Sequence, residues 1–156
     1  PGSTQNYPVL RRVLAYIPDH PERVHHPAED AVFSVIFRNG VSDKQFRDDV
    51  NTLMKDHSEI EGIIRDTIAT VDSVLVSSQP DVARVGEKLS GLINRQREHL
   101  LFEEMNVYPY IAKHLDKKDW ESVAALIPDH EDPIFSGEVK KEYELIFKAI
   151  QAGKAG

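Results

Sequence analysis

The sequence predicts an all-α protein built on long bundle helices, and three observations indicate this fold. Apolar residues recur every three to four positions through most of the chain, which is the period of a helix buried along one face. One such stripe continues for about eight turns between residues 42 and 76, which is long for a globular helix. No segment shows the two-residue alternation typical of a strand.

Six helices are expected, and proline or glycine residues separate them. Pro8 is acceptable in the first turn of the first helix, and the stretch 18–21 breaks that helix. Asn39-Gly40 is a typical C-terminal stop for the second, which starts at either 21 or 27. In chain order, we expect helices at about 7–17, 21–38, 42–76, 81–115, 117–126 and 136–150.

The two longest helices carry the clearest patterns. Ser42 and Gln45 form a capping-box pattern at the start of the third helix. The inward stripe of the fourth helix changes from apolar to polar between Gln96 and Asn106. Pro109 is expected to kink or locally break this fourth helix near its end.

Composition limits the class of protein. A length of 156 residues suits a single domain over residues 1–156, and 40% hydrophobic with 29% charged residues is typical of globular proteins. A net charge of -7 without a basic patch argues against a nucleic-acid partner. No apolar run approaches the roughly 20 residues that span a bilayer, and no signal peptide is visible, so we expect a cytoplasmic protein without a membrane partner. Because the chain has no cysteine, any metal must be held by nitrogen and oxygen ligands.

Three His-x-x-x-Glu pairs on three predicted helices form the candidate site. Residues four apart share one face of a helix, and an imidazole nitrogen beside a carboxylate oxygen suits iron, manganese or zinc. A single inward histidine is more often a hydrogen-bonded core residue. Three inward carboxylates, however, need a compensating cation, so the metal interpretation is favoured. The pairs are His25 with Glu29, His57 with Glu61, and His99 with Glu103.

The remaining histidines and the single tryptophan do not share this pattern. His20 and His130 each end an identical Ile-Pro-Asp-His tetrapeptide, which we interpret as a solvated turn. His114 lies near a helix end, where the helix dipole favours a cation. We interpret Trp120 as a packing anchor of the short helix.

The three His-x-x-x-Glu pairs and the residues around them resemble the hemerythrin-like (HHE cation-binding) domains, bacterial type. The similarity covers about residues 7–150. It implies an up-and-down four-helix bundle with two iron ions, bridged by an oxo or hydroxo group, between the helices. Other divalent metals such as manganese or zinc fit the same ligands. The segments that carry the resemblance are His25-His26-Pro27-Ala28-Glu29-Asp30, Leu53 to His57, His99 to Glu104 with Tyr108-Pro109, and Asp119 to Phe135.

The resemblance implies metal-ligand roles for five residues, matched by position. His25 and Glu29 match the family's His-x-x-x-Glu motif, with Glu29 as a bridge between the metals. His57 matches the histidine of the third family helix. His99 and Glu103 match the pair on the fourth.

Three further assignments stay open. His26 is either a ligand or a hydrogen-bond donor behind the ligands. Glu104 is an alternative to Glu103, because some members place the carboxylate five residues after the histidine. Glu61 lies where oxygen-carrying members have a further histidine. A site this rich in carboxylates favours oxidised iron and redox turnover over reversible oxygen carriage.

The start of the chain departs from the family pattern. The family's first helix normally brings its own histidine, and no histidine precedes His20 here. We therefore expect that helix to lie before Pro1 or to be absent. The open face would then be covered by the 7–17 helix, by the C-terminal helix or by a second chain, and a homodimer is possible.

The resemblance implies a protein that binds two iron ions and interacts with dioxygen, another small oxidant or iron itself. Binding, sensing, storage and detoxification all follow from that chemistry, and the sequence leaves open whether the chain is an enzyme. One alternative is a non-catalytic helical interaction module with an incomplete metal site. Another is a di-iron oxidase, for which we expect an identifiable substrate cavity.

Overall fold

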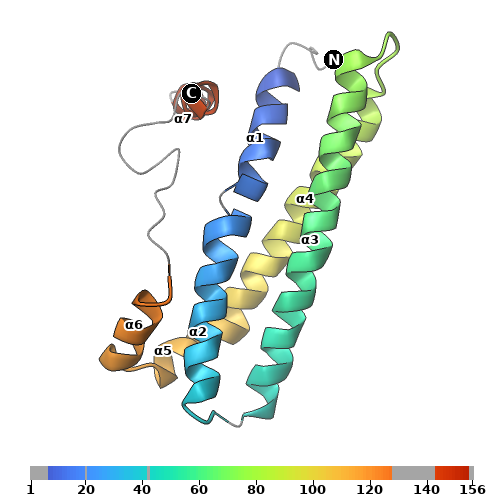
Figure 1. The fold of residues 1–156 in the computed structure, drawn as a ribbon. Coiled ribbons are helices and arrows are strands. Elements are labelled where there is room, and N and C mark those ends of the chain that lie inside the picture. The colour runs from blue at the N-terminus through green and yellow to red at the C-terminus, as the bar shows by residue number, and fades with distance from the viewer. Residues whose placement is uncertain (1–6, 20, 42, 128–142, 155–156) are drawn as a thin grey trace.

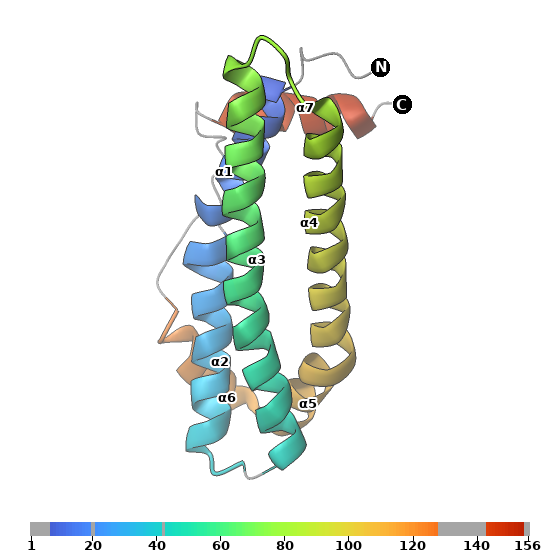
Figure 2. The same cartoon turned by 90° about the vertical axis from the view of Figure 1, so that its right-hand side faces the viewer.

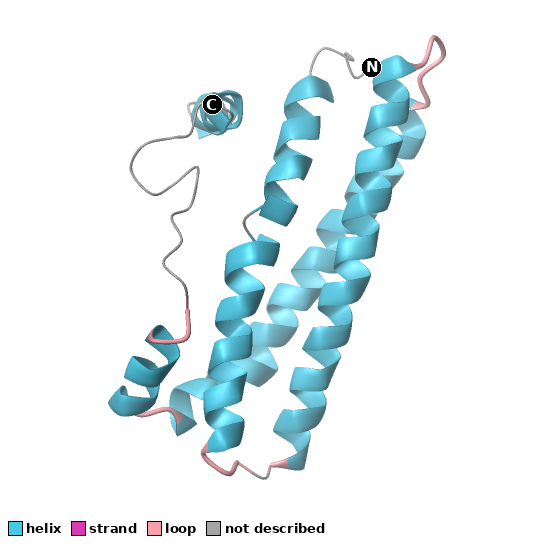
Figure 3. Ribbon diagram, viewed as in Figure 1, coloured by secondary structure: helices cyan, strands magenta, loops and turns pink. Residues whose placement is uncertain are grey.

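The structure is a computed structural model that describes residues 7–19, 21–41, 43–127 and 143–154. Every regular element in these ranges is helical, which confirms the predicted all-α class (Figure 3). The elements are α1 (Tyr7–Asp19), the π-helical turn η2 (Pro21–His25), α2 (His26–Arg38), α3 (Lys44–Val76), α4 (Val82–Phe102), the π-helical turn η3 (Glu103–Val107), α5 (Tyr108–His114), α6 (Lys117–Ala124) and α7 (Glu144–Lys154).

In the described part of the chain, the bundle is built from columns formed by α1 with α2, by α3, and by α4 with η3 (Figure 1). α1 and α2 lie nearly end to end and form one column, and α1 packs against α3. α3 and α4 pack against each other as an antiparallel pair. At one end of the bundle α6 turns back against α2, and at the other end α7 packs across α1 (Figure 2).

A polar side chain caps the start of α3, but it is not the residue expected from the sequence. Asp43 caps α3 by accepting a hydrogen bond from the backbone N–H of Phe46 at 3.1 Å. The predicted start at Ser42 is wrong, because Asp43 is the N-cap of α3, and the Gln45 amide donates a 2.9 Å hydrogen bond to Asp49. Ser42 itself lies outside the described residues.

Proline residues divide two of the columns, and both divisions occur at the candidate site. Pro109 has no N–H, and just before it the N–H of Tyr108 bonds to the carbonyl of Glu103, five residues back. The predicted helix 81–115 is therefore divided into α4, η3 and α5. η2 likewise ends two residues before Pro27. Pro18, in contrast, does not end the first helix at 17, because α1 continues to 19.

Among the described residues the core contains three apolar clusters, and a polar layer lies between the two larger ones. Along α3, Leu53 belongs to one cluster and Ile60 to the other, with the buried His57 between them. Along α4 and η3, Leu92 and Val107 belong to different clusters, and buried polar residues again lie between. Burying polar groups in mid-core is costly unless they are paired, so this layer is where a function is expected.

The C-terminal part of the chain agrees in part with the prediction. α6 ends at Ala124, two residues before the expected 126. The predicted helix 136–150 falls partly outside the described residues, and the structure describes α7 over 144–154. Tyr143, which precedes α7, packs edge-on against Tyr16 of α1, with ring centres 5.7 Å apart. None of the helices in the described ranges has the length and apolar character that a membrane span requires.

Candidate metal centre

The structure brings six of the seven sequence-predicted ligands together in the polar layer. They come from η2, α2, α3, α4 and η3, so every column contributes. Within each of two groups, ligand atoms from three residues lie within 4.8 Å of one another. One group consists of His26, His57 and His99, and the other of His25, Glu29 and Glu103.

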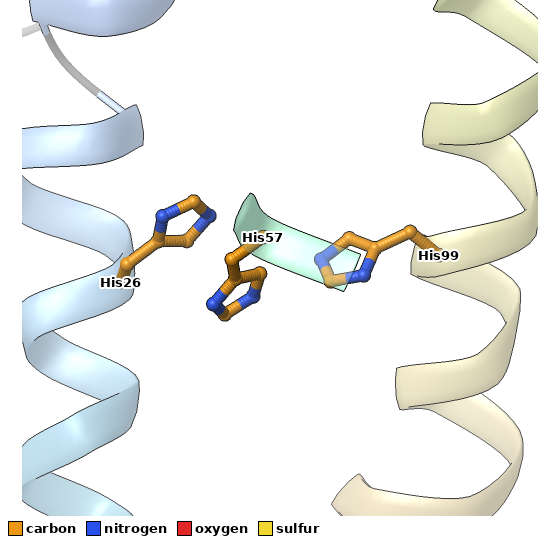
Figure 4. Close-up of side chains that lie close together, drawn as sticks. All are labelled: His26, His57 and His99. Carbon is orange, nitrogen blue, oxygen red and sulfur yellow. The ribbon is translucent and has the colours of Figure 1, made fainter. Parts of the chain in front are cut away.

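The first group contains three imidazoles from three different helices (Figure 4). The rings of His26 and His57 are stacked, with centres 3.7 Å apart. The ring of His99 meets that of His57 edge-on, with centres 4.8 Å apart. Three converging imidazoles are a ligand set that suits zinc, iron or copper.

The two carboxylates of the second group also contact the first group. Glu29 Oε1 lies 3.5 Å from His25 Nε2, and Glu29 Oε2 lies 3.3 Å from His57 Nε2. Glu103 Oε1 lies 2.9 Å from His99 Nε2. Each carboxylate therefore contacts one histidine of the three-imidazole group, so the two groups adjoin each other.

A tyrosine connects the two carboxylates. The Tyr108 hydroxyl donates a hydrogen bond to Glu103 Oε2 at 2.9 Å and lies 3.5 Å from Glu29 Oε1. Burial, followed by the hydrogen bond to Glu103, raises the pKa of Tyr108. The phenol therefore stays protonated at neutral pH and remains a donor.

Burial sets the charge of the centre when no metal is present. Burial and the neighbouring charge of Glu103 raise the pKa of Glu29 to about 8. Burial and the adjacent imidazoles of His26 and His99 lower the pKa of His57 to about 4. Burial also opposes ionisation of Glu103, but the neighbouring side chains of His99 and Tyr108 outweigh it and hold its pKa below the usual value.

Four buried atoms of the two groups make no hydrogen bond with the described residues, namely Glu29 Oε2, His57 Nε2, His99 Nδ1 and Glu103 Oε1. The 3.3 Å contact between Glu29 and His57 and the 2.9 Å contact between Glu103 and His99 bring such atoms together without hydrogen-bond geometry. A buried nitrogen or oxygen without a hydrogen bond is costly, and a cation between these atoms would remove that cost. The two carboxylate oxygens and His57 Nε2 are donors of the kind that iron, manganese and zinc accept, whereas His99 Nδ1 faces Asp56.

An acidic side chain next to the centre faces the back of one histidine. Asp56 Oδ2 lies 3.8 Å from His99 Nδ1, and the same carboxylate forms an ion pair with Arg95. Sequence reasoning did not single out Asp56, although it directly precedes His57. It also missed Tyr108 as a functional residue, because the π-helical turn that positions the hydroxyl leaves no periodic signal.

The solvent exposure of the side chains decides which of the open glutamate assignments fit the centre. Glu61 does not join the centre, because its side chain is exposed and forms an ion pair with Arg65. Glu104 is exposed whereas Glu103 is fully buried, so Glu103 is the carboxylate that faces the core. His114 lies on the surface, and His20 and His130 lie outside the described residues.

Comparison with known proteins agrees with this arrangement. No curated protein and no solved structure matches the chain. A family model described as the hemerythrin HHE cation binding domain matches residues 3–111, which include all six clustered residues. The match covers more than half of the chain and extends through α1, α2, α3 and α4, the helices of the bundle. The protein therefore belongs to the hemerythrin HHE cation-binding domain family.

Proposed function

We propose that the protein holds two iron ions side by side and uses them to interact with dioxygen, another small oxidant or iron itself. The observation that carries this proposal is the pair of adjacent three-residue groups linked by Glu29 and Glu103. The three histidines of one group and the histidine with two carboxylates of the other are each a ligand set for one ion. When bound, a pair of iron ions supplies redox chemistry that protein side chains lack.

The side chains of the centre have distinct tasks in this proposal. His57 is neutral at physiological pH because its pKa is about 4, so its lone pair is available for a cation. Glu29 must first lose its proton, because its pKa is about 8 in the metal-free protein. Tyr108 holds Glu103 in place through its 2.9 Å hydrogen bond and so orients one of the two carboxylates that would hold the metal.

The surroundings of the centre fit a role in binding, sensing or storage. Glu103 and His99 are almost fully buried, so bulk water is kept from one side of the site. We propose a cytoplasmic setting, in which the physiological partner is a small molecule. A second candidate function, a di-iron oxidase, is favoured by a cavity that reaches Glu29 and Tyr108 and has room for an organic substrate.

Metal analysis tests the proposal directly. After anaerobic reconstitution with ferrous iron, removal of loose metal and exposure to air, the protein should contain about two irons per chain and show near-ultraviolet absorption of oxygen-bridged iron. His57→Ala and His99→Ala should each lose most of that metal while the helix content by circular dichroism is kept. His114→Ala removes an exposed histidine and is the matched control.

Two outcomes would overturn the proposal. One is full metal content in both the His57→Ala and the His99→Ala proteins. The other is a stoichiometry that stays at or below one iron per chain in the unaltered protein under saturating conditions. Glu103→Gln compared with Glu104→Gln adds a charge-matched pair, in which only the first should lose metal, because only Glu103 faces the core.

A further inference from the structure

A cavity of about 390 Å³ lies beside the metal centre, between α2, α5 and α6. Its wall consists mostly of apolar side chains, among them Phe33, Ile111 and Trp120. Its polar wall residues are His25, Glu29 and Tyr108, which belong to or contact the metal centre. An apolar cavity of this size with a few polar groups is typical of small-molecule sites.

The side of the cavity formed by α6 is held in place by hydrogen bonds and by a buried contact. Asp116 caps α6 by accepting hydrogen bonds from the backbone N–H groups of Lys118 and Asp119. Asp119 also accepts a 2.8 Å hydrogen bond from the amide of Asn39 at the end of α2. Val123 of α6 is buried and belongs to the apolar cluster that contains Leu53. These contacts hold α6 against α2, so the cavity between them is part of the folded structure.

The tryptophan of α6 behaves differently from the packing anchor expected from the sequence. Trp120 is 45% exposed and forms part of the cavity wall, whereas Val123 supplies the buried contact of this helix. A half-exposed aromatic ring at the edge of an apolar cavity offers a flat surface on which a ligand ring can stack, and the contact would bury apolar area of both rings. Its position indicates recognition of a planar apolar group.

Size and polarity restrict the occupant. A cavity of about 150 Å³ holds one benzene molecule, so about 390 Å³ exceeds what dioxygen needs and has room for a substituted ring. Among the described residues that line the cavity there is no lysine or arginine and Glu29 is the one carboxylate, so these residues offer an anionic ligand no ammonium or guanidinium partner. At the polar end, the Tyr108 hydroxyl already donates to Glu103 and can accept a hydrogen bond.

We propose that this cavity binds a small neutral aromatic alcohol, with its ring against Phe33, Ile111 and Trp120 and its hydroxyl at Tyr108 and Glu29. The proposal rests on the proposed function only in that the hydroxyl end meets residues of the metal centre. It assigns an organic ligand to a protein whose family relationship indicates only a cation. Three converging helices form a hollow suited to one compact molecule, and a helix of another chain would need an extended groove.

Binding of para-tert-butylphenol to the full chain, measured by calorimetry with and without zinc, tests the proposal. One molecule per chain should bind with a Kd on the order of 0.1 mM, and the anionic para-tert-butylbenzoate should bind at least about tenfold more weakly. Trp120 is the single tryptophan, so its fluorescence should change on binding. Metal content is measured on the same samples.

Two substitutions place the ligand in the cavity. Ala112→Phe fills the hollow from α5 and should weaken phenol binding at least about tenfold, with metal content unchanged. Ala69→Phe adds the same ring at an exposed position of α3 outside the cavity and should have no effect. Trp120→Ala, at a half-exposed site that tolerates change, should also weaken binding.

Each outcome decides the question. Absence of phenol binding up to its solubility limit, unchanged affinity in both Ala112→Phe and Trp120→Ala, or preferred binding of the benzoate would overturn the proposal. A dimer that dissociates in Ala112→Phe would assign the hollow to a second copy of the chain and would overturn it as well. Phenol binding without metal would leave the cavity proposal standing and remove the metal proposal, and metal binding without phenol would do the reverse.

Discussion

His57 Nε2 on α3 lies 3.3 Å from Glu29 Oε2 on α2, yet in the metal-free protein this contact is not an ion pair at neutral pH. The pKa of His57 is about 4 and that of Glu29 is about 8, so both groups are uncharged between these values. Burial is the leading cause of both shifts, because it penalises the charged form of either group. Metal entry must therefore replace the carboxyl proton of Glu29 by a cation.

Metal affinity should consequently depend on pH. Because Glu29 is protonated below about pH 8 and the bound form needs a carboxylate, binding should release one proton between pH 6 and 8. The apparent affinity should then rise about tenfold per pH unit in that range. Competition with a chelator of known affinity measures this slope. A slope of zero would mean that Glu29 is already ionised in the metal-free protein.

Stability of the metal-free protein should fall as pH rises from about 6.5 to 8. Glu29 keeps its proton in the folded chain but loses it near 4.5 when unfolded, so rising pH favours the unfolded state over the window 4.5 to 8. His57 acts in the opposite direction between about 4 and 6.5, because the unfolded chain binds the extra proton there. The two effects offset each other below 6.5.

The remaining loss between pH 6.5 and 8 should be about 2 kcal/mol in the free energy of unfolding. Urea titrations of the chelated protein at a series of pH values measure it. Glu29→Gln removes the titrating group and should abolish the decline, which makes it the control. A decline that persists in Glu29→Gln would assign the effect to another group.

The sequence predicted the helices and most of the centre because both depend on local spacing. His25 with Glu29, and His99 with Glu103, are four residues apart, and in the structure all four belong to the two groups of possible metal ligands. Glu61 has the same spacing from His57, yet it is exposed, because the buried stripe of α3 continues through Ile60. Whether a spaced pair is inward depends on the neighbouring helices, and spacing alone does not contain that information.

The position of Tyr108 could not be predicted from spacing, because it depends on a π-helical turn. In a regular α-helix a residue five positions after Glu103 would lie about 140° away around the axis. The π-helical turn at 103–107, next to Pro109, instead brings the Tyr108 hydroxyl to 2.9 Å from Glu103 Oε2. Pro109 indicated that the helix would break, but it did not indicate the π-helical turn that brings Tyr108 to Glu103.

Tyr108→Phe should weaken metal binding while the fold is preserved. The substitution removes the hydroxyl that donates to Glu103 and keeps the ring in place. Loss of a hydrogen bond that orients a ligand typically costs about ten- to a hundredfold in metal affinity. Chelator competition measures the change, and Tyr110→Phe on the same helix is the matched control. Equal affinities for the two variants would show that the hydroxyl does not orient Glu103.

The outer face of α4 and η3 supports the expectation of a homodimer. Four apolar side chains there are exposed by 43% to 69%, and their spacing places them in two neighbouring rows, Ile93 with Leu100 and Leu101 with Met105. A contiguous apolar patch on a monomer is unusual and often marks an interface, which two-fold symmetry can close between identical chains. The residues are Ile93, Leu100, Leu101 and Met105.

We therefore predict a dimer in light scattering at micromolar concentration. A Leu101→Glu, Met105→Glu double variant should be a monomer, because it places two charges in the apolar patch. Met54→Glu introduces the same charge at an exposed methionine of α3 and should remain dimeric. A monomeric unaltered protein would remove the dimer, whereas a dimer that survives the double variant would place the interface on another face. Neither result would change the ligands proposed for the metal centre, because the residues of both groups lie close together within a single chain.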